Sequence, residues 1–97
     1  MAYEYEVIIL STAKSDMSDM IDTLIEDYPD AALRKYDKIM DAAKRLRDTP
    51  YMYEEYAYRK PYRRIVVEDY QVFYIVEEEQ KTVKIYRVLY ERRNINL

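Results

Sequence analysis

YRRIVVEDYQVFYIVEEEQKTVKIYRVLYERR, residues Tyr62–Arg93, is the stretch that decides the fold of this 97-residue chain. Runs of Val, Ile, Tyr and Phe are broken only at Glu68-Asp69 and at Glu77–Lys81, which is the spacing of an antiparallel meander with short connections. Arginines and tyrosines stand at the ends of the strands, so we expect a functional site there. The pattern predicts three strands: Tyr62–Val67, Tyr70–Val76 and Thr82–Tyr90.

A strand and a helix begin the chain. Tyr3–Leu10 alternates and then becomes continuously apolar, as expected of a strand buried on both faces. Ser11 or Thr12 can cap the helix that follows, and Pro29 ends it, because the residue before a proline is pushed out of the helical region. The 3-4 spacing of apolar residues predicts one buried face, made of Ala13, Met17, Met20, Ile21, Leu24, Ile25 and Tyr28.

A second helix completes a helical hairpin. Asp30 can cap this helix and Pro50 marks its end. Its buried face is predicted to hold Leu33, Tyr36, Ile39, Met40, Ala43 and Leu46. The opposite face mixes lysines and arginines with aspartates and reads as a solvated surface with ion pairs four residues apart. The predicted fold is α+β, in the order β-α-α-β-β-β, with an antiparallel meander sheet packed against the hairpin.

Two connections lack the usual turn residues, since the chain has no glycine. At Glu68-Asp69 we expect the aspartate to take the left-handed conformation, which it tolerates better than most residues. The segment Thr49–Pro61 holds four tyrosines and few aliphatic residues. We expect it to lie across the sheet or helices with its rings half-buried, because tyrosine combines an apolar ring with a polar hydroxyl.

The composition excludes several classes of function. The chain has no cysteine and no histidine, which removes thiol nucleophiles, Ser-His-Asp triads and ordinary zinc sites. Without glycine, no phosphate-binding glycine-rich loop can form. We therefore expect neither a metal site nor a cofactor, and any acid-base catalysis must use Glu, Asp, Lys or Tyr. A net charge of -3 argues against direct binding of free DNA, although a local basic face can still contact phosphate.

Length and hydropathy indicate one small domain over residues 1–97. No run reaches the roughly 18 apolar residues that a membrane helix requires, and Met1–Leu10 lacks the pattern of a signal peptide. We expect a cytoplasmic protein without membrane association.

Three segments resemble the RelE/ParE toxin superfamily of bacterial type II toxin-antitoxin systems, of the plasmid stabilisation type. They are the strand-to-helix step Leu10–Ala13, the block YRRIVVEDYQVFYIV at Tyr62–Val76, and VKIYRVLYERRNI at Val83–Ile95. The resemblance covers essentially the whole chain. It implies a toxin that a cognate antitoxin holds inactive and that arrests growth when released. Members similar to RelE cut mRNA in the ribosomal A site, whereas members similar to ParE inhibit DNA gyrase.

The resemblance also points to site residues. Arg63 and Arg64 match the basic start of the second strand, and Tyr90-Glu91-Arg92-Arg93 matches a closing His-x-Arg-Arg segment. Gln71 stands where many ribonuclease members carry arginine. As a nuclease, the chain would rely on Arg64, Arg87 and Tyr90 for catalysis. Contacts to a target or to phosphate would come from Arg63, Arg64, Gln71, Arg92 and Arg93.

Several of these residues also fit purely structural roles. Arg63 and Arg64 are consecutive, so they point to opposite faces of the sheet. Arg87 lies in an apolar strand, which suggests either an edge position or a partly buried ion pair. Tyr90 is a weak base at neutral pH, because an unperturbed tyrosine has a pKa near 10. Replacing an arginine by Gln71 removes a charge that stabilises the transition state, a loss of about 100- to 1000-fold in rate.

Three functions therefore remain. The first is a ParE-like toxin that binds a protein target such as DNA gyrase, which the departures at Gln71 and Tyr90 favour. The second is a ribosome-dependent mRNA endonuclease, favoured by the basic strand ends and the many tyrosines, so whether the chain is an enzyme stays open. The third is a decayed toxin that only binds its antitoxin. All three predict a cognate antitoxin as partner.

Overall fold

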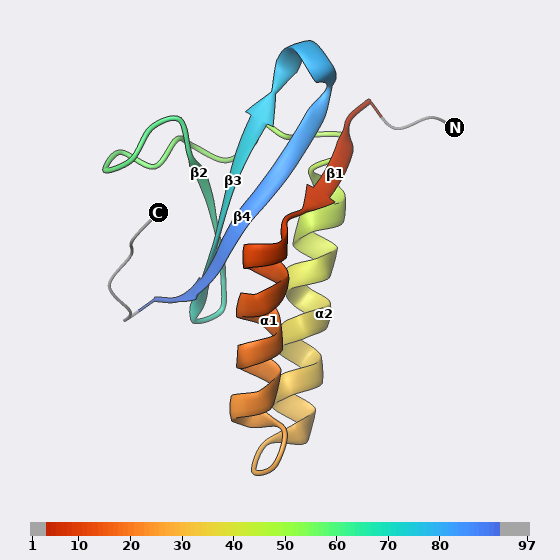
Figure 1. Ribbon diagram of the computed structural model, residues 1–97, viewed down its shortest axis with the longest axis vertical. Helices are drawn as coiled ribbons and strands as arrows, with labels where there is room; N and C mark the ends of the chain where they lie inside the picture. Colours follow the sequence, from red (N-terminus) through yellow and green to blue (C-terminus); the bar gives the residue numbers. More distant parts are fainter. Residues whose placement is uncertain (1–3, 92–97) are drawn as a thin grey trace.

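The computed structural model describes residues 4–91, which form a four-stranded sheet with a helical hairpin packed beside it (Figure 1). The predicted α+β fold and the order β-α-α-β-β-β are confirmed. The strands lie in the order β1-β4-β3-β2, and β1 runs parallel to β4, so the sheet is mixed and not purely antiparallel. The elements are β1 (Glu6–Ile9), α1 (Ser11–Leu24), α2 (Pro29–Arg45), β2 (Arg63–Val67), β3 (Tyr70–Glu77), the 3-10 turn η1 (Glu78–Gln80) and β4 (Thr82–Tyr90).

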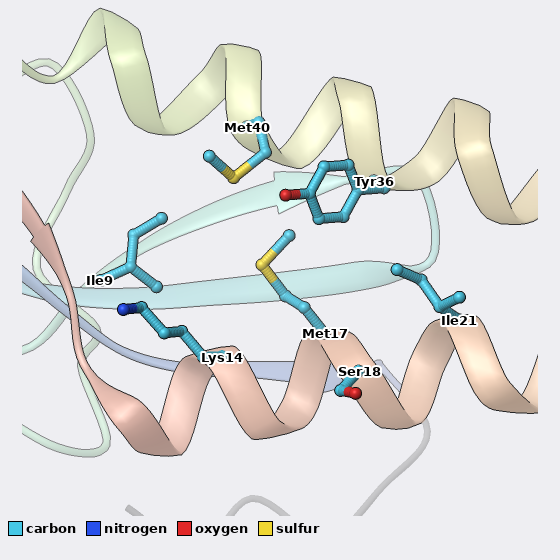
Figure 2. Close-up of a pocket in the computed structure, with 7 residues that line it drawn as sticks. All are labelled: Ile9, Lys14, Met17, Ser18, Ile21, Tyr36 and Met40. Atoms are coloured by element: carbon cyan, nitrogen blue, oxygen red, sulfur yellow. The ribbon is translucent and has the colours of Figure 1, made fainter.

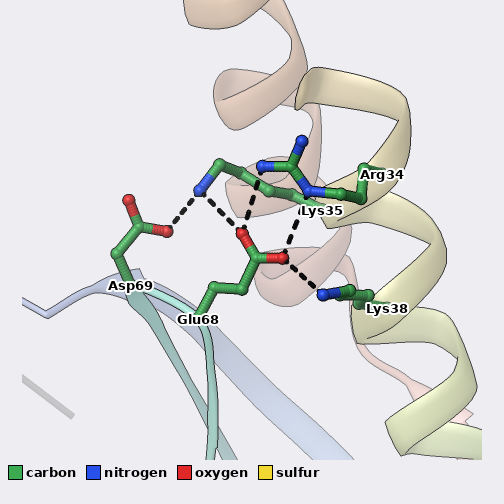
Figure 3. A network of polar contacts seen from close by, with 5 residues as sticks. All are labelled: Arg34, Lys35, Lys38, Glu68 and Asp69. Atoms are coloured by element: carbon green, nitrogen blue, oxygen red, sulfur yellow. Dashed lines mark hydrogen bonds and ion pairs between the residues drawn. The ribbon is translucent and has the colours of Figure 1, made fainter. Parts of the chain in front are cut away.

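The meander of β2, β3 and β4 is confirmed, with both pairs antiparallel. Its first turn differs from the prediction, because Glu68 and not Asp69 has the positive φ, at 54°. A non-glycine residue in this region costs about 1 to 2 kcal/mol. The carboxylate of Glu68 forms ion pairs with Arg34, Lys35 and Lys38 of α2 (Figure 3), which offset that cost.

The strand β1 is shorter than predicted and lies at the edge of the sheet. Its residues alternate between exposed and half-buried, and Ile8 is 36% exposed. The prediction of a strand buried on both faces is therefore wrong. The continuous apolar run arises because Val7 and Ile9 pack against the core, while Ile8 lies on the other face.

Both helices begin without the predicted side-chain caps. The N-cap of α1 is Leu10 and that of α2 is Tyr28. The hydroxyl of Thr12 instead donates to the carbonyl of Tyr86 in β4, at 2.7 Å. The helix α1 already stops at Leu24, and Pro29 begins α2 instead of ending α1. Proline fits the first position of a helix because no backbone donor is needed there. Asp30 lies in the first turn, where a negative charge is favourable.

The core lies between the hairpin and one face of the sheet, here called the inner face. Strand residues such as Ile65, Val72 and Val88 meet the predicted helix residues there, including Met17 and Leu46. Four predicted core residues are instead exposed to between 36% and 64%: Ile25, Tyr28, Leu33 and Tyr36. In α2 the buried positions include Ala32 and Ala42, so the helix is rotated toward its small residues relative to the predicted face.

The connector between α2 and β2 partly follows the prediction. Tyr53 and Tyr56 are half-buried, whereas Tyr51 and Tyr58 are 48% and 86% exposed. The ring of Tyr56 stands edge-on to Phe73, with centroids 5.1 Å apart. Phe73 lies on the outer face of the sheet, away from the hairpin, and is fully buried. The connector therefore covers part of the outer face.

Candidate functional site

The outer face of β2 and β3 carries an arginine that is held in place on two sides. Arg64 Nη1 donates to Gln71 Oε1 at 2.9 Å, and the guanidinium lies 5.1 Å from the centre of the Tyr56 ring. Gln71 is only 5% exposed, whereas Arg64 is exposed. The buried amide thus orients an exposed cation, and an arginine in place of Gln71 would repel Arg64.

Arg63 points away from Arg64, as expected for consecutive strand residues. Its Nη1 donates to the carbonyl of Tyr53 at 2.6 Å, and its guanidinium lies 4.9 Å from the centre of the Tyr51 ring. Both contacts are with the connector. Arg63 therefore holds the connector against the start of β2, on the other side of the strand from Arg64.

Arg87 forms an ion pair with α1. Its Nε and Nη2 donate to the two carboxylate oxygens of Asp16, at 2.8 and 2.9 Å. Asp16 is 8% exposed and also accepts the backbone N–H of Val88 at 2.9 Å. These hydrogen bonds raise the pKa of Arg87 above its usual value, despite an opposing effect of burial. The ion-pair interpretation is confirmed, and Arg87 also lies beyond Ile85, where the pairing of β1 with β4 ends.

Tyr90 lies on the inner face of the sheet. It pairs with Tyr70, which packs against the core, and the two ring centroids are 5.6 Å apart. Gln71 follows Tyr70 directly and so points to the outer face. The structure therefore brings Arg64 and Gln71 together and places Tyr90 on the opposite side. Arg92 and Arg93 lie outside the described residues.

Comparison with known proteins identifies the family to which this chain belongs. The family described as "ParE toxin of type II toxin-antitoxin system, parDE" matches residues 7–95. The chain belongs to the ParE toxin family. This ParE-family chain also lies within the RelE/ParE superfamily suggested by its sequence. No curated protein matched the chain significantly.

Solved structures share the fold of this ParE-family chain. The chromosomal ParDE TA system from P. aeruginosa matches with a TM-score of 0.78 and 16% identity, over 92% of this chain and 98% of the other. The toxin-antitoxin complex RelBE2 from Mycobacterium tuberculosis has a TM-score of 0.65 and 20% identity, over 90% and 98%. The archaeal RelE-RelB complex from Pyrococcus horikoshii OT3 also has 0.65, with 18% identity, over 93% and 98%.

Sequence reasoning missed a polar cluster around Glu78. The hydroxyls of Tyr5 and Tyr51 both donate to Glu78 Oε1, at 2.7 and 2.5 Å, and Lys81 contacts the other oxygen. Hydrogen bonds from Lys81, Tyr51 and Tyr5, in that order of strength, lower the pKa of Glu78 to about 2. The hydrogen bond to Glu78 raises the pKa of Tyr51 to about 12. No sequence signal joins these residues, because they come from three separate segments.

Within residues 4–91, no group of three or more Asp or Glu side chains is arranged to hold a metal ion. No helix in that range is long and apolar enough to cross a membrane. Arg64 is a fixed and accessible cation, so the outer face can bind an anionic or aromatic group of a partner.

Proposed function

We propose that the chain is the toxin of a type II toxin-antitoxin system, that it arrests growth by binding a protein target, and that a cognate antitoxin neutralises it. The match to the ParE toxin family over residues 7–95 supports this proposal. DNA gyrase is the first candidate target, since the resemblance to ParE implies it. We treat residues 1–97 as one toxin domain that acts in the cytoplasm, where such a target is found.

The observation that favours binding over cleavage is the separation of the three proposed catalytic residues. Cutting RNA requires a base, an acid and a cation around one phosphate. Arg87 is engaged by Asp16, and Arg64 lies on the outer face beside Gln71, while Tyr90 lies next to Tyr70 on the inner face. Arg64 is therefore proposed to contact the target, in the orientation that the buried Gln71 gives it. Target contacts by Gln71 itself and by Arg63, Arg92 and Arg93 stay predictions from the sequence.

One observation favours the RelE-like alternative, a ribosome-dependent mRNA endonuclease. Arg64 is stacked on Tyr56, and Tyr56 lies beside the highly exposed Tyr58, with ring centroids 5.4 Å apart. Arginine and aromatic rings side by side can contact phosphate and stack on bases. A decayed toxin that only binds an antitoxin remains the third alternative.

Expression without and with the antitoxin separates these functions. We expect growth arrest that the product of a neighbouring antitoxin gene relieves, loss of supercoiling by purified gyrase in the presence of the toxin, and intact mRNA. Arg64→Ala should reduce both arrest and gyrase inhibition, and a thermal melt checks that the variant is still folded. Cleavage in the ribosomal A site with normal gyrase activity would establish the endonuclease instead. Unchanged growth without the antitoxin would leave the decayed toxin.

A further inference from the structure

A pocket of about 480 Å³ lies where the connector meets β2. Side chains of the strand and of the connector line it together, and we call it the connector pocket. Its lining combines tyrosine rings with charged groups of both signs, and includes Glu54, Glu55, Tyr56, Tyr58, Arg64 and Val66.

The positive charge of the connector pocket has a fixed direction. Arg64 is held by the buried Gln71 and by the ring of Tyr56, and it forms no ion pair with another residue of the range 4–91. Its charge therefore remains free for a partner. The ring of Tyr58, 5.4 Å from that of Tyr56 and 86% exposed, adds an open aromatic surface beside the guanidinium.

Two carboxylates line the same pocket without a cation to neutralise them. Glu54 and Glu55 are exposed, and neither forms an ion pair within the described part of the chain. Both contact β2 through the backbone: the carbonyl of Glu54 accepts the N–H of Arg64 at 3.4 Å, and Glu55 pairs with Arg63. That pairing does not use the carboxylates, which therefore also remain free for a partner.

This balance of charges favours one kind of partner. A nucleic-acid strand carries a negative charge on every phosphate, and two carboxylates beside one guanidinium would repel it. Arg59 and Lys60 follow Tyr58 in the connector but do not line the pocket. A protein segment can bring both signs of charge together with an apolar side chain for the tyrosine rings, so it complements the whole lining.

We infer that the connector pocket binds a short segment of the protein target in which an acidic and a basic residue flank an apolar or aromatic one. The acidic residue pairs with Arg64, and the basic residue meets Glu54 and Glu55. The apolar side chain lies against the rings of Tyr56 and Tyr58. This inference rests on the proposed function and adds to it the chemistry of the segment that is recognised.

Reversal of the two carboxylates has opposite effects for a protein partner and for a nucleic acid. The double variant Glu54→Lys, Glu55→Lys should repel the basic residue of a protein target. We expect it to raise the toxin concentration that gives half-maximal growth arrest at least about tenfold. The same change would strengthen contact with phosphate and would lower that concentration. Growth at graded expression levels, with the toxin quantified by immunoblot, measures the effect.

The matched control is the double variant Asp27→Lys, Glu79→Lys. It changes the charge by the same amount at two exposed positions that form no ion pair within residues 4–91, and it should arrest growth as the wild type does. The apolar hollow between α1 and α2, which Met17 and Met40 line (Figure 2), contains none of the four substituted residues. Both variants therefore leave that second surface unchanged.

Thermal melts check that the lysine variant is folded. If it melts below the wild type, Glu54→Gln, Glu55→Gln takes its place, and growth arrest equal to that of the wild type would then overturn the inference. A folded lysine variant that is as toxic as the wild type, or more toxic, would overturn it too. So would tighter binding of a 12-nucleotide single-stranded RNA by this variant, measured by fluorescence anisotropy, together with greater toxicity. A wild type that does not arrest growth would instead overturn the proposed function, and the inference with it.

Discussion

Asp16 of α1 binds Arg87 of β4 through both carboxylate oxygens, and the same carboxylate accepts the N–H of Val88. The strand β1 stops at Ile9, where it pairs with Ile85, so the next part of the β4 edge has no neighbouring strand. Thr12 and Asp16 supply hydrogen bonds there in place of a strand. The helix thus satisfies backbone groups that would otherwise be open at this edge.

Removal of Asp16 should destabilise the protein. Asp16→Ala leaves the guanidinium of Arg87 and the N–H of Val88 without a partner, and Asp16 is almost fully buried. We expect a loss of about 2 to 3 kcal/mol in the free energy of unfolding, less than for a fully buried pair because Arg87 is partly exposed. Urea denaturation measures this loss. Asp19→Ala is the control, since Asp19 is exposed, and a change above about 0.5 kcal/mol there would question the assignment.

Two arginines should give opposite results in toxicity and stability. Arg87→Ala breaks the contact with Asp16 and should lower the melting temperature by several degrees. Arg64→Ala removes an exposed side chain that donates to the buried Gln71, so it should reduce growth arrest with a smaller fall in melting temperature than Arg87→Ala. Parallel growth assays and thermal melts measure both effects. A stable Arg87→Ala protein with no toxicity would instead assign a direct functional role to Arg87.

Acid should weaken the contact between α2 and the turn after β2. Hydrogen bonds from Lys38, then Arg34, then Lys35 lower the pKa of Glu68 from 4.5 to about 2. Because the folded pKa is the lower one, this stabilisation is present above about pH 4.5 and is lost as the pH falls toward 2. Glu68→Gln should therefore be less stable than the wild type at pH 7 and equally stable near pH 2. Denaturation over this pH range tests it, with Glu26→Gln as the control without an ion pair.

A buried tyrosine hydroxyl ties the connector to the sheet. Tyr74 is fully buried and its hydroxyl donates to the carbonyl of Pro50 at 2.7 Å. Tyr74→Phe leaves that carbonyl without this donor, so we expect a loss of about 1 to 2 kcal/mol. Tyr58→Phe, at an 86% exposed position, should change stability by less than about 0.5 kcal/mol. Equal effects in urea denaturation would contradict the role of the hydrogen bond.

The same tyrosine should limit stability in alkali. Burial raises the pKa of Tyr74 from 10.0 to about 12. Since the folded pKa is the higher one, this contribution is fully present below about pH 10 and is lost as the pH rises toward 12. The wild type should lose more stability over this range than Tyr74→Phe. Denaturation at pH 9 and pH 11 measures the difference, and parallel loss in both proteins would contradict the prediction.

The order of the elements followed from local patterns, because alternation and helical spacing are properties of neighbouring residues. The buried face of α2 could not be predicted in this way. Ala32 and Leu33 begin two adjacent rows of residues that have the same helical spacing. The sequence favours the larger side chain, but the structure buries Ala32 and leaves Leu33 exposed.

Contacts between residues far apart in the sequence also could not be predicted from local patterns. An ion pair for Arg87 was among the expected alternatives, but its partner Asp16 stands 71 positions away, so the neighbouring residues could not identify it. The prediction of a left-handed conformation at Asp69 was wrong for the same reason. Glu68 takes this conformation where its carboxylate meets three cations of α2, which the turn sequence does not reveal.

The parallel pairing of β1 with β4 has a consequence for synthesis. Thr12 and Tyr86, which are hydrogen-bonded where the two strands meet α1, are 74 positions apart. At about 5 to 20 residues per second, β1 and α1 leave the ribosome several seconds before the strand that completes their side of the sheet. A nascent chain therefore lacks the complete sheet until β4 emerges, so the folded surface forms only after β4 has been synthesised.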